Sequence, residues 1–297
     1  MIIGINNLRV CQKFFSKMLR VEKLHKREHF ESVIAFNAFI MSLKKDGHRT
    51  FFIDDPSNYP KCDLVLSFNI PKYLDKDNFS FESEIWKTQA ERGDSVLVFE
   101  AGYVNRELDN PKPYFSLGFN GLNGRAKFVR ENMPSDRWDK LGVEIKPWRE
   151  GGNIILFCGQ IPDDGAVQHF DYENLLTSTM IEVGNRFNKL VTFRPHPLHN
   201  KKEYIFPQRI FISENENIKE DFEDCFCVCA ANSNSLVEAT IEGIPTITCD
   251  YEGCMVKSVT NKLEDIIELG DNKLSTFDRE SWKNNLAYSQ WTCEEML

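Results

Sequence analysis

Short apolar runs alternate with amphipathic stretches along the first hundred residues of this chain. Residues 2–5 and 63–68 are apolar runs of strand length. Residues 32–45 carry apolar side chains at helical spacing, and Gly47 follows where a helix would be capped. Strands that alternate with helices predict parallel sheets with helices on both faces. The other elements expected here are strands at 50–53 and 95–100 and a helix at 81–92.

The same alternation resumes after a long interruption. Residues 103–147 are rich in Gly, Asn and Pro, which predicts an irregular connection, and a connection of this length is more often functional than idle. Beyond it we expect strands at 153–157, 190–193, 209–213, 225–231 and 246–249, and helices at 172–187, 218–224 and 235–242. The pattern predicts an α/β protein of two domains, 1–148 and 149–277, followed by a C-terminal helix at 278–297.

Polar residues gather after three of the expected strands in the second half. In a parallel sheet these strand ends lie at one edge, where ligands of α/β proteins bind. Arg194 and His196 offer a guanidinium and an imidazole, and the segment from Asn232 offers hydroxyls, amides and the free N–H groups of a helix start. Such groups predict a site for the phosphates of a nucleotide. The candidate nucleotide-binding residues are Gly159, Gln160, Arg194, His196, Asn232, Ser233, Asn234 and Ser235.

Plainer explanations exist for some of these residues. His196 lies between Pro195 and Pro197 and can be explained as a rigid turn residue. Ser235 and Glu238 have the S-x-x-E spacing of a helix capping box, which needs no ligand. Both alternatives stay open on the sequence alone.

The order of these segments resembles one family. Arg194-Pro195-His196-Pro197, followed by Asn232-Ser233-Asn234-Ser235 and then by Glu238-Ala239 with Gly243 and Pro245, is similar to the donor half of GT-B glycosyltransferases. The similarity is greatest to the capsule-polysaccharide type and to phage-encoded relatives. It implies a GT-B fold, in which two Rossmann-like domains face each other across a cleft. The first domain would bind the acceptor, the second a nucleotide sugar, and residues 278–297 would cross back to the first.

The resemblance also implies roles for matching positions. In the family, an "HP" motif and a Ser/Thr motif hold the nucleotide, and Glu238 matches the Glu that binds the ribose hydroxyls. The implied donor is a UDP-sugar, with a CMP-sugar as the alternative. No metal and no cofactor besides the donor is expected.

Transfer of a sugar with inversion needs a base, because the acceptor hydroxyl loses its proton as it attacks the anomeric carbon. Glu100 ends an expected strand and resembles the start of the family's "EDG" segment, from which this chain departs at Ala101. If the base of the relatives is that Asp, Glu100 is a structural carboxylate at a strand end. Asp163 and Asp164 are then the other candidates, although they also have the composition of a simple turn.

Residues that could bind the acceptor lie in the first half. Aromatic and basic residues interleave in 114–130, which suits stacking on a base or a sugar ring. Residues 1–50 carry ten Lys and Arg against four acids, which describes either a solvated helix face or a surface for a polyanion such as DNA. The candidate acceptor-binding residues are Lys13, Lys17, Lys26, Arg27, Tyr103, Asn120, Asn123 and Arg125.

The likeness to phage-encoded proteins, concentrated in 100–103 and 114–130, favours an acceptor that bacteriophages modify, a hydroxymethylated pyrimidine in their DNA. Such a base would have to be flipped out of the duplex. The net charge of −9 argues against strong DNA binding. Two alternatives therefore remain. One is a transferase acting on a capsule or surface glycan. The other is a nucleotide-sugar enzyme without transfer, such as an epimerase, or a binding module on the same scaffold.

Composition indicates the class of protein and the cellular compartment. Hydrophobic residues make up 41% of the chain and charged residues 27%, which is typical of a globular protein, and neither a membrane-spanning run nor a secretory signal is expected. Nine cysteines cannot all pair, so we expect a reducing cytoplasm, that of the infected host if the chain is phage-encoded. Cys225, Cys227 and Cys229 alternate within an expected strand, which predicts three buried thiols on one face.

Overall fold

The computed structural model describes residues 1–6, 25–68, 81–106, 112–128, 132–162, 164–167, 172–197, 204–206, 209–269 and 273–296. The chain divides into two compact units. Unit 1 comprises Met1–Leu122, Ala126–Arg137 and Asn285–Leu297, and unit 2 comprises Asn123–Arg125 and Trp138–Asn284. Apart from the short segment Asn123–Arg125, the chain passes from unit 1 to unit 2 at 137/138, whereas the sequence had predicted 148/149, and Asn285–Leu297 belongs to unit 1.

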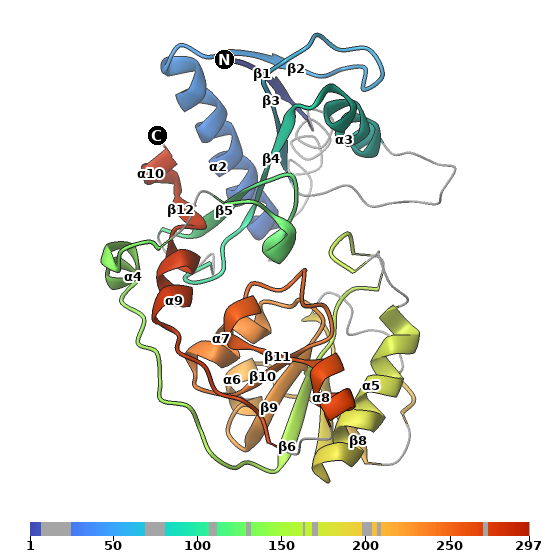
Figure 1. Cartoon of the computed structure of the whole chain (residues 1–297). Helices are drawn as coiled ribbons and strands as arrows, with labels where there is room; N and C mark the ends of the chain where they lie inside the picture. Colours follow the sequence, from blue (N-terminus) through green and yellow to red (C-terminus); the bar gives the residue numbers. More distant parts are fainter. Residues whose placement is uncertain are drawn as a thin grey trace. The chain divides into compact units, whose positions relative to one another are not determined.

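Unit 1 is built on a six-stranded sheet in the order β12-β5-β4-β3-β1-β2 (Figure 1). The strands are β1 (Ile2–Ile5), β2 (Arg49–Phe52), β3 (Leu64–Phe68), β4 (Ser95–Ala101), β5 (Tyr114–Phe119) and β12 (Gln290–Thr292). The first four are parallel to one another, whereas β5 pairs antiparallel with both β4 and β12. The sheet is thus mixed, although strict alternation of strands and helices had predicted a parallel one.

Each face of the unit 1 sheet carries its own apolar core. On one face Ile3, Leu66 and Phe99 pack with Phe36 of helix α2 (His25–Lys45). On the other face strand residues such as Val65 and Val98 pack with side chains of helix α3 (Phe81–Arg92). Because successive strand residues point to opposite faces, both sets can be buried within the same strands. The short helix α10 (Cys293–Met296) packs on α2.

Unit 2 contains a second six-stranded sheet, in the order β11-β10-β9-β6-β7-β8. Its strands, all parallel, are β6 (Ile154–Cys158), β7 (Leu190–Arg194), β8 (Ile210–Ile212), β9 (Cys225–Ala230), β10 (Thr246–Thr248) and β11 (Asn261–Lys262). Starting at the β8 edge, the order is β8, β7, β6, β9, β10 and β11. The first three strands of the unit therefore lie in reverse sequence order, and the last three lie in sequence order. This is the doubly wound Rossmann order, and its switch point lies between β6 and β9.

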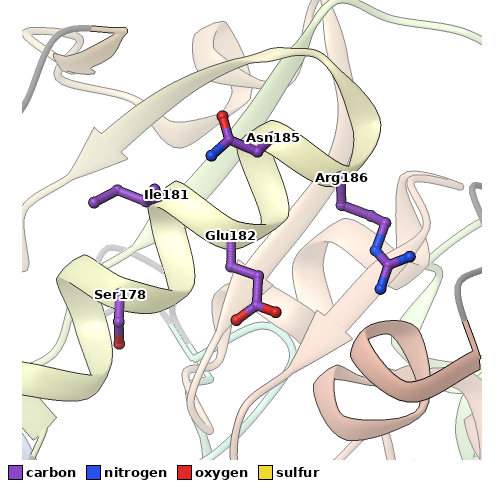
Figure 2. Close-up of a pocket in the computed structure, with 5 residues that line it drawn as sticks. All are labelled: Ser178, Ile181, Glu182, Asn185 and Arg186. Carbon is purple, nitrogen blue, oxygen red and sulfur yellow. The ribbon is translucent and has the colours of Figure 1, made fainter.

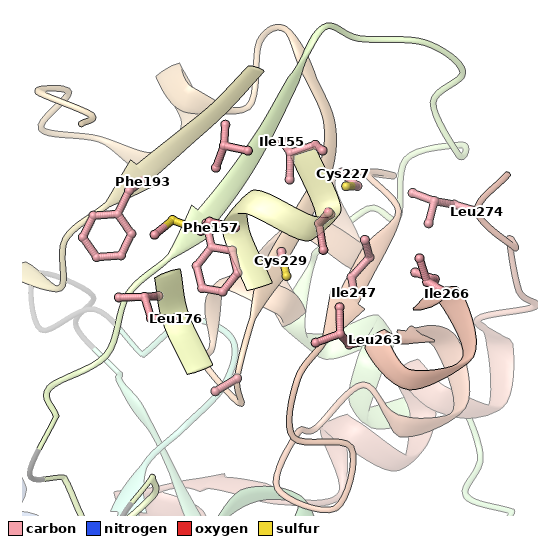
Figure 3. Close-up of a cluster of buried hydrophobic side chains, with 14 of the residues drawn as sticks. Ile155, Phe157, Leu176, Phe193, Cys227, Cys229, Ile247, Leu263, Ile266 and Leu274 are labelled. Atoms are coloured by element: carbon pink, nitrogen blue, oxygen red, sulfur yellow. The ribbon is translucent and has the colours of Figure 1, made fainter. Parts of the chain in front are cut away.

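Helices cover both faces of the unit 2 sheet. Figure 3 shows one face, where Ile155 and Phe157 pack with Leu176 of α5 (Tyr172–Phe187) and with Leu263 and Ile266 of α8 (Leu263–Leu269). Helix α7 (Ser235–Ile241) packs on β9 and β10. The other helical segments are η1 (Asn123–Arg125), α4 (Asp136–Leu141), α6 (Ile218–Asp221), η3 (Lys257–Val259) and α9 (Glu280–Ala287). In the part of the chain that the structure describes, no helix combines the length and apolarity needed to cross a membrane.

Two expectations about regular structure are wrong. The stretch 103–147 is not irregular throughout, because β5 lies within it and Phe115, Leu117 and Phe119 alternate onto the α2 face. The tail 278–297 is not one helix, since α9 is followed by β12 and then by α10.

The three alternating cysteines of β9 do not share one face. Cys227 and Cys229 lie in the core beneath α5 and α8. An irregularity in the β6–β9 register between Ile154 and Ile155 turns Cys225 to the other face, although it is equally buried. An extra residue in one strand has this effect because it reverses the side-chain alternation beyond it.

Candidate functional site

The carboxyl edge of the unit 2 sheet brings together side chains that follow the strands on either side of the switch point. Gln160 comes after β6 and Asn232 after β9, and Gln160 Nε2 donates to Asn232 Oδ1 over 3.1 Å. Asn232 is 4% exposed. Two residues predicted to bind nucleotide are therefore in direct contact at the crevice where ligands of doubly wound sheets bind.

Asn232 is the centre of a wider network. Its Nδ2 donates to the Ala166 carbonyl oxygen over 2.7 Å and to Asp250 Oδ2 over 2.8 Å. Ala166 belongs to the loop after β6, and Asp250 follows β10. One buried amide thus links the loops that follow three neighbouring strands, and such full use of its polar atoms fixes its orientation.

Asp250 places a buried carboxylate at this edge. Its carboxylate accepts two hydrogen bonds from the Arg125 guanidinium, over 2.6 and 2.7 Å, and a third from the Gly253 N–H over 3.2 Å. The Asp250 side chain is 6% exposed and that of Arg125 is 38% exposed. Arg125 had been assigned to acceptor binding in the first domain, but the structure places it in unit 2, with its guanidinium held by Asp250.

Arg125 reaches Asp250 because the chain before it approaches the unit 2 backbone very closely. The Gly124 N–H donates to the Gly253 carbonyl oxygen over 3.0 Å. A Cβ at Gly124 would overlap the carbonyl oxygens of Cys254 and Glu252. Only glycine fits at this position, because the opposing atoms are main-chain atoms that cannot turn away.

Replacing Gly124 by alanine is therefore expected to undock η1 and to break the Arg125–Asp250 pair. We expect the free energy of unfolding of the variant to be roughly 1–3 kcal/mol lower than that of wild type, which corresponds to a fall of about 3–10 °C in Tm. Differential scanning fluorimetry measures this, with Lys127→Ala as the control because Lys127 is exposed in the same stretch. Equal melting temperatures for Gly124→Ala and wild type would contradict the close approach.

The Ser/Thr segment at α7 does not form the capping box that its spacing allows. Ser235 is the first residue of the helix, and the Ser233 hydroxyl accepts the Ser235 N–H over 3.3 Å. Glu238 instead accepts from Asn234 Nδ2 over 3.0 Å. The capping-box explanation of Ser235 and Glu238 is thus removed, and both remain candidates for binding a nucleotide.

The Ser235 hydroxyl lies beside the thiol of Cys158, at the end of β6. Burial raises the pKa of Cys158 to about 12, and the Ser235 hydroxyl lowers it only in part. The thiol is therefore neutral at physiological pH and provides a small apolar wall for this edge of the site.

Arg194 and Gly159 have structural partners. Arg194 Nη1 donates to Asp221 Oδ2 over 2.6 Å, and its two terminal nitrogens donate to main-chain oxygens of Asn215 and Glu216 over 2.8 Å each. The Gly159 N–H donates to the Arg194 carbonyl oxygen over 2.8 Å, and a Cβ at Gly159 would press into the Phe193 ring. These contacts favour roles in holding the loops over roles in binding phosphate. His196, half-buried, follows β7 at the same edge.

Of the two aspartates considered as bases, only Asp164 lies in the described residues. Its Oδ1 accepts the Ala166 N–H over 2.9 Å, which closes a turn. This is the simple turn that the sequence allowed. The turn also places the Ala166 carbonyl oxygen where Asn232 donates to it, so Asp164 supports the network without bonding to Asn232 itself.

Glu100 lies in unit 1, at the carboxyl end of β4. Its Oε1 accepts the N–H of the next residue, Ala101, over 3.0 Å. Glu100 is partly exposed. Tyr103, two positions beyond Ala101, is buried, and its main-chain N–H donates to Gln290.

The remaining acceptor candidates have turn roles or lie outside the described structure. Asn120 and Asn123 adopt left-handed backbone conformations with φ of 55° and 51°, and Asn120 Oδ1 accepts the Val96 N–H over 2.8 Å. Lys13 and Lys17 lie outside the described residues, as does Asp163. Lys26 and Arg27 lie in α2, where only their backbone is described.

A depression elsewhere on unit 2 contains none of the candidate residues. It has a volume of about 680 Å³. Figure 2 shows the side chains of helix α5 that line it, Ser178, Ile181, Glu182, Asn185 and Arg186. Arg186 also donates to the Ile267 carbonyl oxygen of α8. The carboxyl edge of the sheet, not this depression, carries the polar network described above.

Comparison with known proteins identifies the fold. No protein-family model matches the sequence, and no curated protein matches it. A solved β-Kdo 2,4-transferase, KpsC of Thermosulfurimonas dismutans, is similar with a TM-score of 0.57 and 11% sequence identity, covering 97% of this chain and 90% of that chain. The β-Kdo 2,7-transferase of the same KpsC has a TM-score of 0.48 and 12% identity, covering 99% and 96%.

A solved UDP-GlcNAc 2-epimerase of Methanocaldococcus jannaschii has a TM-score of 0.33 and 11% identity, covering 95% of this chain and 97% of that chain. The likeness to the 2,4-transferase, together with two units that each contain a largely parallel sheet, confirms the expected GT-B fold. Identity this low carries the fold and not the activity.

Proposed function

We propose that this chain is a glycosyltransferase that moves a sugar from a nucleotide sugar to an acceptor hydroxyl. The observation that carries the proposal is the network of Gln160, Asn232 and Asp250 at the switch point of the unit 2 sheet. The GT-B fold supports it, because a transferase with this fold is similar along nearly the whole chain.

The proposal assigns the donor to unit 2. Gln160 and Asn232 would contact the nucleotide at the switch point, the Ser233–Ser235 segment its phosphates, and Glu238 its ribose hydroxyls. His196 joins them from the end of β7. A UDP-sugar is the first donor to test and a CMP-sugar the second, and the proposed reaction needs neither a metal nor another cofactor.

Glu100 is the proposed base. As the acceptor oxygen attacks the anomeric carbon, its proton passes to the Glu100 carboxylate. The bond between the anomeric carbon and the phosphate oxygen breaks, and the nucleotide leaves with that electron pair. One such displacement inverts the anomeric configuration. Glu100 is suited to this role because it lies at the carboxyl end of β4 and the residue is partly exposed.

A saccharide is the acceptor class that the structural likeness favours, because the similar transferase is named for a sugar linkage. A hydroxymethylated pyrimidine in phage DNA remains the competing acceptor. The ion pair between Arg125 and Asp250 weakens the case for DNA, because it neutralises one of the basic residues predicted to bind the acceptor.

Binding of nucleotides tests the donor site first. Purified protein is heated with UDP, CMP, GDP or dTDP, each alone. A nucleotide at a hundred times its Kd stabilises the folded state by about 2.7 kcal/mol, so one of the four is expected to raise Tm by several degrees. No rise with any nucleotide would remove the donor site and with it the proposed function.

Product analysis then separates the alternatives. The sugar nucleotides of the selected base are incubated with a capsule-type oligosaccharide or with hydroxymethylated DNA, and products are identified by mass spectrometry. A glycosylated saccharide supports the proposal, and glycosylated DNA supports the competing acceptor. Conversion of the donor to an isomeric nucleotide sugar without a glycosylated product would indicate an epimerase.

A further inference from the structure

The C-terminal segment places a buried amide against the loop that follows Glu100. Gln290, in β12, is fully buried. Its Oε1 accepts the N–H groups of Tyr103 and Val104 over 2.7 and 3.0 Å, and its Nε2 donates to the Val104 carbonyl oxygen over 3.1 Å. A side chain almost two hundred residues away in sequence thus binds three main-chain groups of one short loop.

These contacts satisfy groups that are costly to leave unpaired. Tyr103 and Val104 are only 5% and 7% exposed, so water has little access to their main-chain N–H groups. A buried N–H without an acceptor costs about 1–3 kcal/mol. The amide orientation of Gln290 is also unambiguous, because only its oxygen can face two donors and only its nitrogen can face a carbonyl.

The strand register places Gln290 on the side of the sheet where Glu100 lies. Glu100 pairs with Ser116 across β4 and β5, and Ser116 pairs with Gln290 across β5 and β12. Residues directly opposite each other point to the same face, so all three side chains form one row. Two strand spacings separate Glu100 from Gln290, which is roughly 10 Å.

Gly102 allows the loop to approach this amide. A Cβ there would lie 2.6 Å from the Tyr114 carbonyl oxygen and 3.0 Å from Gln290 Oε1. The Gly102 N–H donates to that same Tyr114 oxygen over 2.9 Å. The loop is therefore fixed directly after Ala101, the residue whose N–H binds Glu100.

Arg137 holds the backbone of Gln290 in turn. Its Nη2 donates to the Gln290 carbonyl oxygen over 2.8 Å, and its guanidinium binds both carboxylate oxygens of Glu295, over 2.9 and 3.0 Å. The guanidinium lies over the Trp291 ring, 4.0 Å from the ring centroid. Burial acts to raise the pKa of Glu295, but hydrogen bonds from Arg137 and Thr292 hold it below its usual value, so the carboxylate stays charged.

We infer that Gln290 is a positioning residue that fixes the loop 102–105 and, through it, the carboxylate of Glu100 for proton transfer. The inference rests on the proposed function, since it gives Glu100 the task of a base. Gln290 acts through the loop and has no contact with the reacting atoms. Strand β12 thereby contributes to the reaction by holding the loop that follows Glu100.

Two substitutions of Gln290 test this inference. Gln290→Met keeps the length of the side chain but removes all three hydrogen bonds. Gln290→Glu keeps oxygens that can accept from Tyr103 and Val104 and so should retain part of the effect. Tyr288→Phe is the matched control, because it removes a hydrogen bond of the same segment, to Asp136 Oδ1, at an exposed site.

Amide hydrogen exchange and steady-state kinetics are measured on the full chain. Binding of the nucleotide selected by thermal shift checks that unit 2 of each variant is folded. For Gln290→Met we expect at least tenfold faster exchange at the amides of Tyr103 and Val104, and at least a tenfold lower kcat with KM for the donor within twofold. Gln290→Glu should fall between Gln290→Met and wild type, and Tyr288→Phe should match wild type.

Unchanged exchange in Gln290→Met, or a kcat within twofold of the Tyr288→Phe control, would overturn the inference. If wild-type protein binds nucleotide but transfers no sugar, the proposed function fails. Exchange at Tyr103 and Val104 then decides separately whether Gln290 holds the loop.

Discussion

Replacing Glu100 by glutamine is expected to lower the rate of sugar transfer by about a hundredfold to ten-thousandfold, the range that a positioned general base contributes. The amide keeps the size of the side chain and an oxygen that can accept the Ala101 N–H, so the strand end should keep its structure. It cannot take a proton from the acceptor hydroxyl. Steady-state kinetics with the selected donor should therefore show a loss of kcat with little change in KM for the donor.

The control for this substitution is Glu91→Gln. Glu91 is an exposed carboxylate of helix α3 in the same unit, where it lies beside Lys87. Its removal should leave both the rate and the Tm shift with nucleotide unchanged. If Glu100→Gln retains the full rate, the base lies elsewhere, and Asp163→Asn and Asp164→Asn become the next variants to measure.

Replacing Asp250 by asparagine is expected to weaken nucleotide binding by about 10-fold to 100-fold, or about 1.4–2.8 kcal/mol. The Asp250 carboxylate accepts from Arg125, Asn232 and the Gly253 N–H. An amide in either orientation turns an N–H2 group toward two of these donors. With the N–H2 group toward Asn232, Asn232 loses an acceptor that fixes its orientation and its contact to Gln160. With the N–H2 group on the other side, one Arg125 bond and the bond from the Gly253 N–H are lost instead.

The same substitution should also lower stability. Donors left without an acceptor cost about 1–3 kcal/mol each when buried, but the Arg125 side chain is partly exposed and can bind water. A net loss of about 2–3 kcal/mol is expected, or about 5–10 °C in Tm. Isothermal titration of the selected nucleotide and a thermal melt measure the two effects.

Glu252→Gln is the matched control for Asp250→Asn. Glu252 lies two residues further along the same loop, is largely exposed, and pairs with Lys257 at the surface. Surface pairs of this kind contribute little, so affinity and Tm should match wild type. If Asp250→Asn binds nucleotide as tightly as this control does, the network is structural and takes no part in the donor site.

The elements of unit 2 could be predicted from the sequence because their patterns are strong and local. Helix α5 begins and ends where its apolar spacing predicts, and β6 and β9 lie within one residue of their expected bounds. Buried parallel strands form nearly continuous apolar runs, which need no knowledge of their neighbours to be recognised. The GT-B fold, expected from the resemblance, is confirmed.

Strands β5 and β12 could not be placed in the same way. The alternation of Phe115, Leu117 and Phe119 is visible at a period of two, but it lies in a stretch whose Gly, Asn and Pro content indicates loop. The apolar residues of 278–297 have spacings that suit a helix as well as a strand. Pairing of β12 with β5 decides its conformation, and such tertiary context overrides local preference.

The candidate site was predicted in part. The sequence identified Gln160 and Asn232 as members of loops at one sheet edge, and the structure brings them into contact. It gave no indication of Asp250, because a single Asp after a three-residue strand has no local signature. The partner of Asp250 is Arg125, which lies 125 positions earlier, and only the folded chain reveals that pair.

Neither unit is continuous in the sequence, and this has a consequence for synthesis of the protein. Unit 1 includes Asn285–Leu297, whereas both segments of unit 2, Asn123–Arg125 and Trp138–Asn284, precede it in the sequence. During translation the second unit can therefore be completed first, with Asn123–Arg125 already available to it. Strand β5 keeps one unpaired edge until β12 has left the ribosome, and an unpaired strand edge invites association with other chains. A chain cut short before β12 would thus have a complete unit 2 and an incomplete unit 1.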